Sequence, residues 1–233
     1  MRYARYMTKA PPLLHAIEVV LFDLDGTLVN TLELILESMR YTTNEVLGAP
    51  LPDDVLMHNV GVPLAVQMRE FSPEHAEELL AVYRRHNDRV HDALIREYPG
   101  VDSALQQLSA AGYRMGVVTS KLHRGAQRGL DRFSLGRFFE VLVGSDDVEL
   151  HKPDPFPLLH AAGLMGGEPG HCVYVGDSPH DMAAARAAGM VAIAATWGVS
   201  SRERLADAGA QYATHSMAEV AAVLCGHEAG FVV

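Results

Sequence analysis

Residues 19–27, Val-Val-Leu-Phe-Asp-Leu-Asp-Gly-Thr, combine a short apolar run with two closely spaced carboxylates and a glycine. The run is too short for a helix and is rich in β-branched and aromatic residues, which predicts a buried β-strand. Open α/β sheets bind ligands beyond the carboxyl ends of their strands, where Asp23 and Asp25 would then lie. Two neighbouring carboxylates repel each other unless a cation neutralises them, and oxygen ligands suit Mg²⁺. This stretch therefore predicts an α/β sheet with a candidate Mg²⁺ site at its edge.

The remainder of the chain predicts helices and strands in alternation, apart from one long helical block. Amphipathic helical patterns separate four further runs of strand type, at 113–118, 139–143, 172–175 and 191–194. Because strands that alternate with helices over short connections form parallel sheets covered on both faces, we expect a doubly wound, Rossmann-like α/β core.

The helical block is expected to interrupt this core between its first and second strands. It carries amphipathic helical patterns and no convincing strand, and Ser72 and Pro73 fit the N-cap and first position of its last helix. The expected division is an α/β core at residues 1–32 and 98–233, with a loose N-terminal extension at 1–16, and an inserted all-α unit at residues 33–97.

The composition is that of an ordinary globular protein. The chain has 233 residues, of which 48 % are hydrophobic, and a formal net charge of −10. This acidic balance argues against nucleic acid or an anionic membrane as a partner, and no apolar run approaches the length of a membrane span. Cys172 and Cys225 match no disulfide or metal-binding pattern, so the expected location is the reducing cytoplasm.

Polar residues follow four of the expected strands. They are Asp23, Asp25 and Thr27; Thr119, Ser120 and Lys121; Lys152 and Pro153; and Asp177, Ser178 and Asp181. Since the carboxyl ends of parallel strands share one edge of the sheet, we expect these residues to converge. Lysine is scarce, with three lysines against sixteen arginines, which argues against Lys152 as a generic surface residue. Carboxylates, an ammonium group and hydroxyls together suit Mg²⁺ and a phosphoryl group.

Such a site has the components that phosphoryl transfer requires. One carboxylate can attack phosphorus and form an aspartyl-phosphate, and a second can protonate the leaving oxygen and then activate water. Ser178 and Asp181 also fit a capping box, so we expect Asp181 to support the site indirectly and Asp177 to be the better metal ligand. The competing interpretation of Asp23 and Asp25 is turn and N-cap chemistry, which does not explain the residues at the other strand ends.

These motifs, in this order, resemble those of the haloacid dehalogenase-like superfamily of phosphatases, and the resemblance covers nearly the whole chain from Val19 onward. The four motifs are Asp23-Leu-Asp25-Gly-Thr27, Thr119 after Val-Val, Lys152-Pro153, and Gly176-Asp177-Ser-Pro-His-Asp181. The resemblance implies that Asp23 is the nucleophile and Asp25 the acid/base. It also implies that Mg²⁺ is held by Asp23, the backbone carbonyl of Asp25, and Asp177.

The resemblance further implies that Thr119 and Lys152 hold the phosphate, and Ser120 is expected beside them. The helical insertion resembles the mobile cap of the first subclass, which closes over small substrates and sets specificity. The expected partner is a small phosphorylated substrate, and the expected assembly is a monomer or a homodimer.

Within the superfamily, the chain is most similar to the pyrophosphatase branch, followed by phosphoglycolate phosphatases. The segments that suggest the first are Val29-Asn30-Thr31, Tyr83-Arg84…Asn87…His91-Asp92 and Asp146-Asp147. Asn30 departs from the Asp common in phosphoglycolate enzymes, whereas Tyr98-Pro99-Gly100-Val101 is commoner among them. The leading hypothesis is Mg²⁺-dependent hydrolysis of inorganic pyrophosphate, with 2-phosphoglycolate or a related monoester as the alternative.

Other activities fit the sequence less well. A dehalogenase of this superfamily uses neither a metal nor the acid/base that Asp25 provides. A phosphonate-cleaving enzyme needs a lysine in the cap, and residues 33–97 contain none. A phosphomutase stays open, and a binding protein without catalysis is disfavoured because all the expected catalytic side chains are present.

Several residues of the helical insertion are candidates for substrate contact. Asn87 interrupts the apolar stripe of the last inserted helix, which favours a buried, hydrogen-bonded amide over a residue of the substrate pocket. The role of His91 is left open. The arginines either neutralise a polyanionic substrate or form an ordinary solvated helix face; they are Arg69, Arg84, Arg85 and Arg89.

Overall fold

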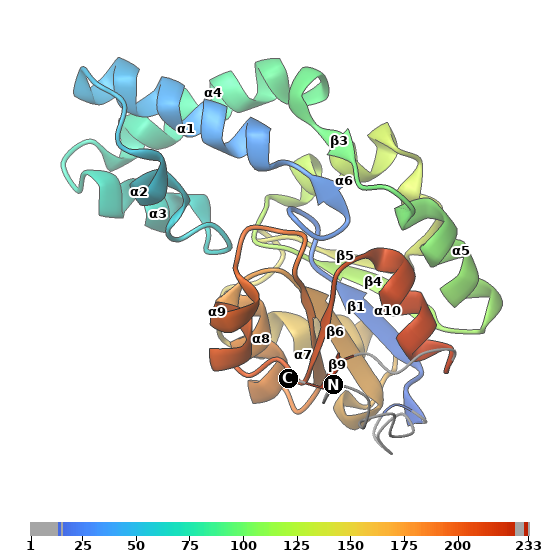
Figure 1. The fold of residues 1–233 in the computed structure, drawn as a ribbon. Helices are drawn as coiled ribbons and strands as arrows, with labels where there is room; N and C mark the ends of the chain where they lie inside the picture. Colours follow the sequence, from blue (N-terminus) through green and yellow to red (C-terminus); the bar gives the residue numbers. More distant parts are fainter. Residues whose placement is uncertain (1–13, 15, 227–230, 233) are drawn as a thin grey trace, which may run out of the picture.

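The computed structural model describes residues 14, 16–226 and 231–232. Most of the extension expected at residues 1–16 lies outside these residues, although Leu14 is buried against the core. Figure 1 shows an α/β part with a layer of helices above one edge of its sheet. Within the described part of the chain, no helix combines the length and the apolar character needed to span a membrane.

The α/β part contains one sheet whose strands lie in the order β5-β4-β1-β6-β7-β8-β9. The strands are β1 (Val19–Phe22), β4 (Arg114–Val118), β5 (Val141–Val143), β6 (Cys172–Gly176), β7 (Val191–Ala195), β8 (Tyr212–Thr214) and β9 (Phe231–Val232). The pairs from β5 to β8 are parallel, and β9 adds to the edge in the antiparallel direction. The expected parallel, doubly wound sheet is therefore confirmed, and β8 and β9 extend it beyond the last strand that the sequence predicted.

The central strand β1 explains why the quoted sequence stretch is apolar throughout. Val20 and Phe22 point into the hydrophobic cluster on one face of the sheet, and Val19 and Leu21 into the cluster on the other. On the first face pack α5 (Val101–Ala110), α6 (His123–Arg132) and α10 (Met217–Leu224), and on the second α7 (Phe156–Leu164), α8 (Pro179–Ala187) and α9 (Arg202–Asp207). Because both faces are covered, each buried Val, Leu or Phe side chain contributes about 1.5–3 kcal/mol of hydrophobic stabilisation.

The helices of the insertion form what we call the helical unit, with a hydrophobic cluster of its own. The unit comprises α1 (Leu32–Leu47), α2 (Asp53–Met57), α3 (Leu64–Phe71) and α4 (Ala76–Leu94). Its apolar cluster includes Met39 of α1, Leu56 of α2, Met68 of α3 and Leu79 of α4. The chain enters and leaves the unit through β2 (Val29–Asn30) and β3 (Arg96–Glu97), which pair with each other in the antiparallel direction (Figure 1).

Two expectations for this unit are wrong: Arg96–Glu97, placed in an all-α insertion without strands, form β3, and the last inserted helix starts later than expected. The last inserted helix begins at Ala76 with His75 as N-cap, and Ser72 instead follows the end of α3. The Ser72 hydroxyl lies 3.0 Å from His75 Nδ1, so its hydrogen-bonding capacity is used in the turn before the helix. The apolar positions that follow are those of the expected helix, but the turn between α3 and α4 takes up its first three residues.

Candidate active site

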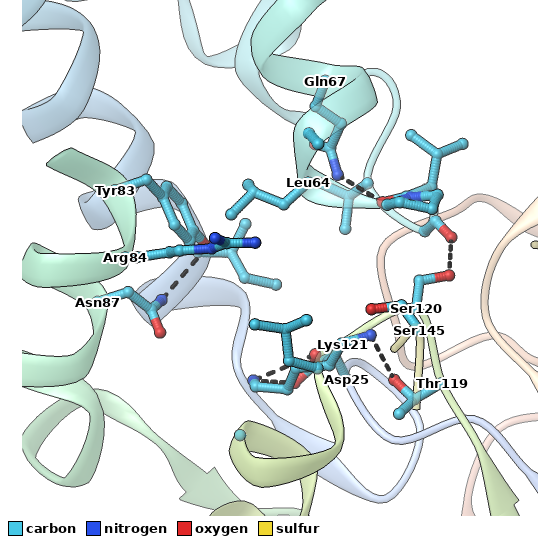
Figure 2. Close-up of a pocket in the computed structure, with 18 of the residues that line it drawn as sticks. Asp25, Leu64, Gln67, Tyr83, Arg84, Asn87, Thr119, Ser120, Lys121 and Ser145 are labelled. Atoms are coloured by element: carbon cyan, nitrogen blue, oxygen red, sulfur yellow. Dashed lines mark hydrogen bonds and ion pairs between the residues drawn. The ribbon is translucent and has the colours of Figure 1, made fainter. Parts of the chain in front are cut away.

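The carboxyl ends of β1, β4 and β6 open into a cavity of about 620 Å³ that the helical unit covers. Figure 2 shows Asp25, Thr119, Ser120 and Lys121 of the α/β part facing Leu64, Gln67, Tyr83, Arg84 and Asn87 of the helical unit. The strand order changes direction at β1, because the chain proceeds to β4 and β5 on one side and to β6 and β7 on the other. The cavity therefore lies where doubly wound sheets bind their ligands.

Three buried carboxylates meet at the base of this cavity. Asp23 follows β1, Asp177 follows β6, Asp181 lies in the first turn of α8, and one oxygen of each lies within 4.8 Å of the others. Burial raises the pKa of Asp23 to about 7. Attraction to Lys152 opposes this rise, and repulsion from Asp181 and Asp25 adds to it. Burial, with repulsion from Asp23 and Asp181, raises the pKa of Asp177 well above its ordinary value.

Lys152 supplies the positive charge inside this cluster. Its Nζ lies 2.7 Å from Asp181 Oδ1 and 3.2 Å from Asp23 Oδ1, and it donates to the Tyr174 hydroxyl at 2.9 Å. Burial opposes the charged ammonium, but attraction to Asp181 and Asp23 outweighs it and raises the pKa of Lys152. Lys152 therefore stays protonated although only 3 % of it is exposed.

Asp181 is fully committed to partners within the protein. It forms the capping box expected from the sequence, since its Oδ2 accepts from the Ser178 amide at 2.9 Å and the Ser178 hydroxyl at 2.7 Å. Its Oδ1 accepts from Lys152. With both oxygens occupied, Asp181 holds Lys152 and the start of α8 in place beside Asp23.

Asp177 is held by the loop after β7 and by the turn after β1. Its Oδ2 accepts from the Val199 amide at 2.7 Å, and the Thr27 hydroxyl lies 3.4 Å from its Oδ1. A Cβ at Gly26 would lie 2.1 Å from Asp177 Oδ2, and one at Gly198 would lie 2.2 Å from its Cβ. The two glycines therefore give the Asp177 carboxylate the room to reach Asp23.

Asp25 lies apart from the buried carboxylates and is held by a different lysine. Lys121 Nζ donates to its Oδ1 at 2.9 Å and to its Oδ2 at 3.2 Å. Both side chains are partly exposed and line the cavity. Asp25 is thus the carboxylate with access to a bound molecule and to water.

The hydroxyls after β4 have different partners. Thr119 is buried and its Oγ1 accepts from the Lys121 amide at 3.2 Å. Ser120 Oγ donates to the Gly61 carbonyl of the helical unit at 2.7 Å, as the dashed line in Figure 2 shows. The Ser120 hydroxyl thus connects the α/β part to the helical unit, a contact that the expected phosphate-binding role did not include.

The residues of the helical unit that the sequence offered for substrate contact do not all reach the cavity. Asn87 Nδ2 donates to Ser38 Oγ and to the Tyr83 hydroxyl, each at 3.3 Å, so the amide is hydrogen-bonded as expected and also lines the cavity. His91 is buried, with Nδ1 2.7 Å from Asp92 Oδ1, and burial lowers its pKa. Arg84 and Arg85 line the cavity, whereas Arg89 lies over the Tyr41 ring.

The geometry of the carboxylate cluster fits a hard divalent cation. Asp23 Oδ1 is buried and accepts no hydrogen bond; its one charged neighbour among the described residues is Lys152 Nζ at 3.2 Å, so the oxygen keeps capacity to coordinate a cation. Asp23 and Asp177 supply oxygens of the kind that Mg²⁺ prefers, and a cation would offset the repulsion that raises their pKa values. The Asp25 side chain is not part of this cluster among the described residues, since its carboxylate pairs with Lys121.

The sequence placed Lys121 at this edge of the sheet without assigning it a role, and it did not single out Tyr174. Lys121 follows directly after Thr119 and Ser120, and the scarcity of lysine was the available signal for it. Tyr174 lies inside β6, and its hydroxyl donates to the Val118 carbonyl at 2.8 Å while it accepts from Lys152. No sequence signal distinguished Tyr174 from an ordinary core tyrosine.

Comparison with known proteins assigns this architecture to a family. A family model described as haloacid dehalogenase-like hydrolase matches residues 20–195. The chain is 34 % identical to "Pyrophosphatase PpaX" of Halalkalibacterium halodurans over 88 % of this chain and 95 % of the relative. It is 35 % identical to "Pyrophosphatase PpaX" of Listeria monocytogenes over 91 % and 98 %. A crystal structure of a predicted phosphoglycolate phosphatase from Haemophilus somnus superposes with a TM-score of 0.77 and 26 % identity, covering 88 % of this chain and 96 % of that one.

Proposed function

Since the chain belongs to the haloacid dehalogenase-like hydrolases, we propose that it is a Mg²⁺-dependent phosphohydrolase that works through an aspartyl-phosphate on Asp23. The observation that carries this proposal is the buried cluster of Asp23, Asp177 and Asp181 around Lys152, at the base of a cavity that a second carboxylate, Asp25, also lines. The family and the named relatives make the chain an enzyme of the phosphatase type. What we propose beyond this is the requirement for Mg²⁺, the aspartyl-phosphate intermediate and the identity of the substrate.

Asp23 and Asp25 divide the chemistry between them. A carboxylate oxygen of Asp23 attacks phosphorus and forms a P–O bond while the bond to the leaving oxygen breaks. Asp25 gives its proton to that leaving oxygen, and then takes a proton from the water that attacks the aspartyl-phosphate and releases phosphate. The partial exposure of Asp25 supports this role, because an acid/base must reach both the leaving group and water.

The surrounding residues orient the reacting groups. Asp23 and Asp177, with the backbone carbonyl of Asp25, would hold Mg²⁺, whose positive charge keeps the carboxylates ionised and neutralises phosphoryl oxygens. Lys152 holds Asp23 in place and presents its ammonium charge 3.2 Å from Asp23 Oδ1. Thr119 at the end of β4 is the proposed hydroxyl ligand of the phosphate.

In this proposal, Ser120 holds the helical unit against the α/β part. Its hydrogen bond to the Gly61 carbonyl holds the loop before α3 against the carboxyl ends of the strands. We propose that the helical unit acts as a cap that opens for substrate and closes to exclude water during the first step.

Inorganic pyrophosphate is the proposed substrate. The two named pyrophosphatases cover nearly the whole chain, and the cavity wall carries several cationic side chains. A small phosphoester such as 2-phosphoglycolate is the second candidate, because Ile35, Met39 and Leu64 give the same cavity an apolar wall that an organic group could contact.

Phosphate release from a substrate panel tests this proposal. The panel holds pyrophosphate, 2-phosphoglycolate and sugar phosphates, each measured with Mg²⁺ and with EDTA. Replacing Asp23→Asn removes the nucleophile and should lower kcat at least about a thousandfold on every active substrate. Asp207→Asn, an exposed residue of α9 that does not line the cavity, is the control and should retain the wild-type rate. Near-normal turnover by the Asp23→Asn variant would disprove the covalent mechanism.

A further inference from the structure

The cavity is unusually rich in cations for so acidic a protein. The chain has a formal net charge of −10, yet five basic side chains line this one cavity, namely Arg84, Arg85, Lys121, Arg124 and Arg128. The acidic side chains among the lining residues lie mainly at the base, in Asp23, Asp25 and Asp177. The cavity therefore has an anionic base, suited to metal and phosphorus, and a cationic wall.

Two of these cations already have anionic partners. Lys121 is held by Asp25 at 2.9 Å. Arg128 is held by Asp88 at 2.6 Å and by Asp92 at 3.0 Å. In contrast, within residues 14, 16–226 and 231–232, the other three, Arg84, Arg85 and Arg124, form no ion pair and no hydrogen bond. A guanidinium without a protein partner can offer its donors to a bound anion.

The position of Arg84 favours contact with a bound molecule. Figure 2 shows its side chain projecting from α4 beside Tyr83 into the open centre of the cavity. Asn87 donates to Ser38 of α1, which holds this part of α4 against α1, and to the Tyr83 hydroxyl one turn earlier on α4. Arg89, on the same helix, lies over the Tyr41 ring and does not line the cavity. The helix therefore presents Arg84, and not Arg89, to the substrate.

We propose that Arg84 binds a second anionic group of the substrate, so that the enzyme acts on compounds that carry an anion close to the transferred phosphoryl group. This inference rests on the proposed function, because it concerns the molecule from which Asp23 takes the phosphoryl group. The second anion is the other phosphate of a diphosphate or the carboxylate of a phosphorylated acid. Both present oxygens to a guanidinium in the same way, and the substrate panel distinguishes them.

Steady-state kinetics of three variants test the role of Arg84. The substrates are pyrophosphate and 2-phosphoglycolate, with two anionic groups, and p-nitrophenyl phosphate, with one. Arg84→Gln should lower kcat/KM for the preferred two-anion substrate about ten- to a hundredfold, mainly through KM, and change hydrolysis of p-nitrophenyl phosphate less than threefold. Arg84→Lys should retain more activity than Arg84→Gln, since it keeps the charge. Arg89→Gln is the matched control and should behave as the wild type.

A binding measurement keeps the test independent of turnover. By calorimetry with Mg²⁺ present, Arg84→Gln should weaken binding of methylenediphosphonate about tenfold or more and leave binding of methylphosphonate unchanged. Equal losses on one-anion and two-anion ligands, or no loss on either, would overturn the inference. If the wild-type enzyme releases phosphate from no substrate, the proposed function itself fails. If it is active and the Arg84 variants show no selectivity, only the role of Arg84 fails.

Discussion

Replacing Lys152→Met should destabilise the protein strongly, because it removes the only cation in contact with the buried carboxylates among the described residues. Lys152 forms ion pairs with Asp181 and Asp23 and donates to the Tyr174 hydroxyl, and 3 % of it is exposed. Removal of one partner from a buried ion pair costs about 3–5 kcal/mol. Since domains are stable by about 5–15 kcal/mol, this loss is a large fraction of the total.

The loss should depend on pH in a defined direction. Without Lys152, the pKa of Asp23, already raised by burial, rises further above its value in the unfolded chain. The folded variant then binds protons more readily than the unfolded chain, so lowering the pH stabilises it by about 1.4 kcal/mol per unit for each proton taken up. The difference in stability between wild type and variant should therefore be largest at pH 8 and smaller at pH 5.5.

Urea denaturation followed by circular dichroism, with EDTA present, measures this difference. Lys121→Met is the control, since its ion pair with Asp25 is reached by water and should contribute about 1 kcal/mol or less. A loss below about 1 kcal/mol for Lys152→Met, or a loss independent of pH, would show that the charge of Lys152 does not stabilise the carboxylate cluster.

Two further substitutions test contacts around the cavity. Gly26→Ala would place a Cβ 2.1 Å from Asp177 Oδ2, so it should abolish Mg²⁺-dependent phosphate release. Gly48→Ala is the control, because Gly48 has the same positive φ but a Cβ there would meet no atom within 4 Å. The control should lower the free energy of unfolding, measured by urea denaturation, by only about 1–2 kcal/mol. Comparable activity in the two variants would contradict this reasoning. Ser120→Ala removes the hydrogen bond to the Gly61 carbonyl and should speed amide exchange in residues 58–64 about two- to tenfold, measured by mass spectrometry; unchanged exchange would show that Ser120 does not hold the loop.

The parts of the fold that the sequence predicted depend on local patterns. Residues 19–22 are apolar at every position because both faces of β1 are buried, and this continuous pattern identified the central strand. The expected strands at 113–118, 139–143, 172–175 and 191–194 match β4, β5, β6 and β7 within two residues at each end. The strand β8 and the helices on either side of it received no prediction.

The contacts that the sequence could not predict join distant segments. Ser120 and Gly61 belong to different parts of the fold, so their hydrogen bond depends on how the helical unit lies over the sheet. The same orientation decides that Arg84 lines the cavity while Arg89 does not, although both lie on α4. Charge and helical periodicity describe a single segment of sequence, so they do not show how the helical unit is oriented over the sheet.

The paired strands β2 and β3 give the helical unit a narrow attachment. Asn30 and Arg96 are neighbours across this pair, so the two ends of a long insertion lie side by side in space. An exchange of residues 31–95 for another segment with adjacent ends would leave the register of the main sheet unchanged. The carboxylate cluster of Asp23, Asp177 and Asp181 lies outside the exchanged segment, so we expect such an exchange to leave the cluster in place and to change only the side chains that line the other wall of the cavity.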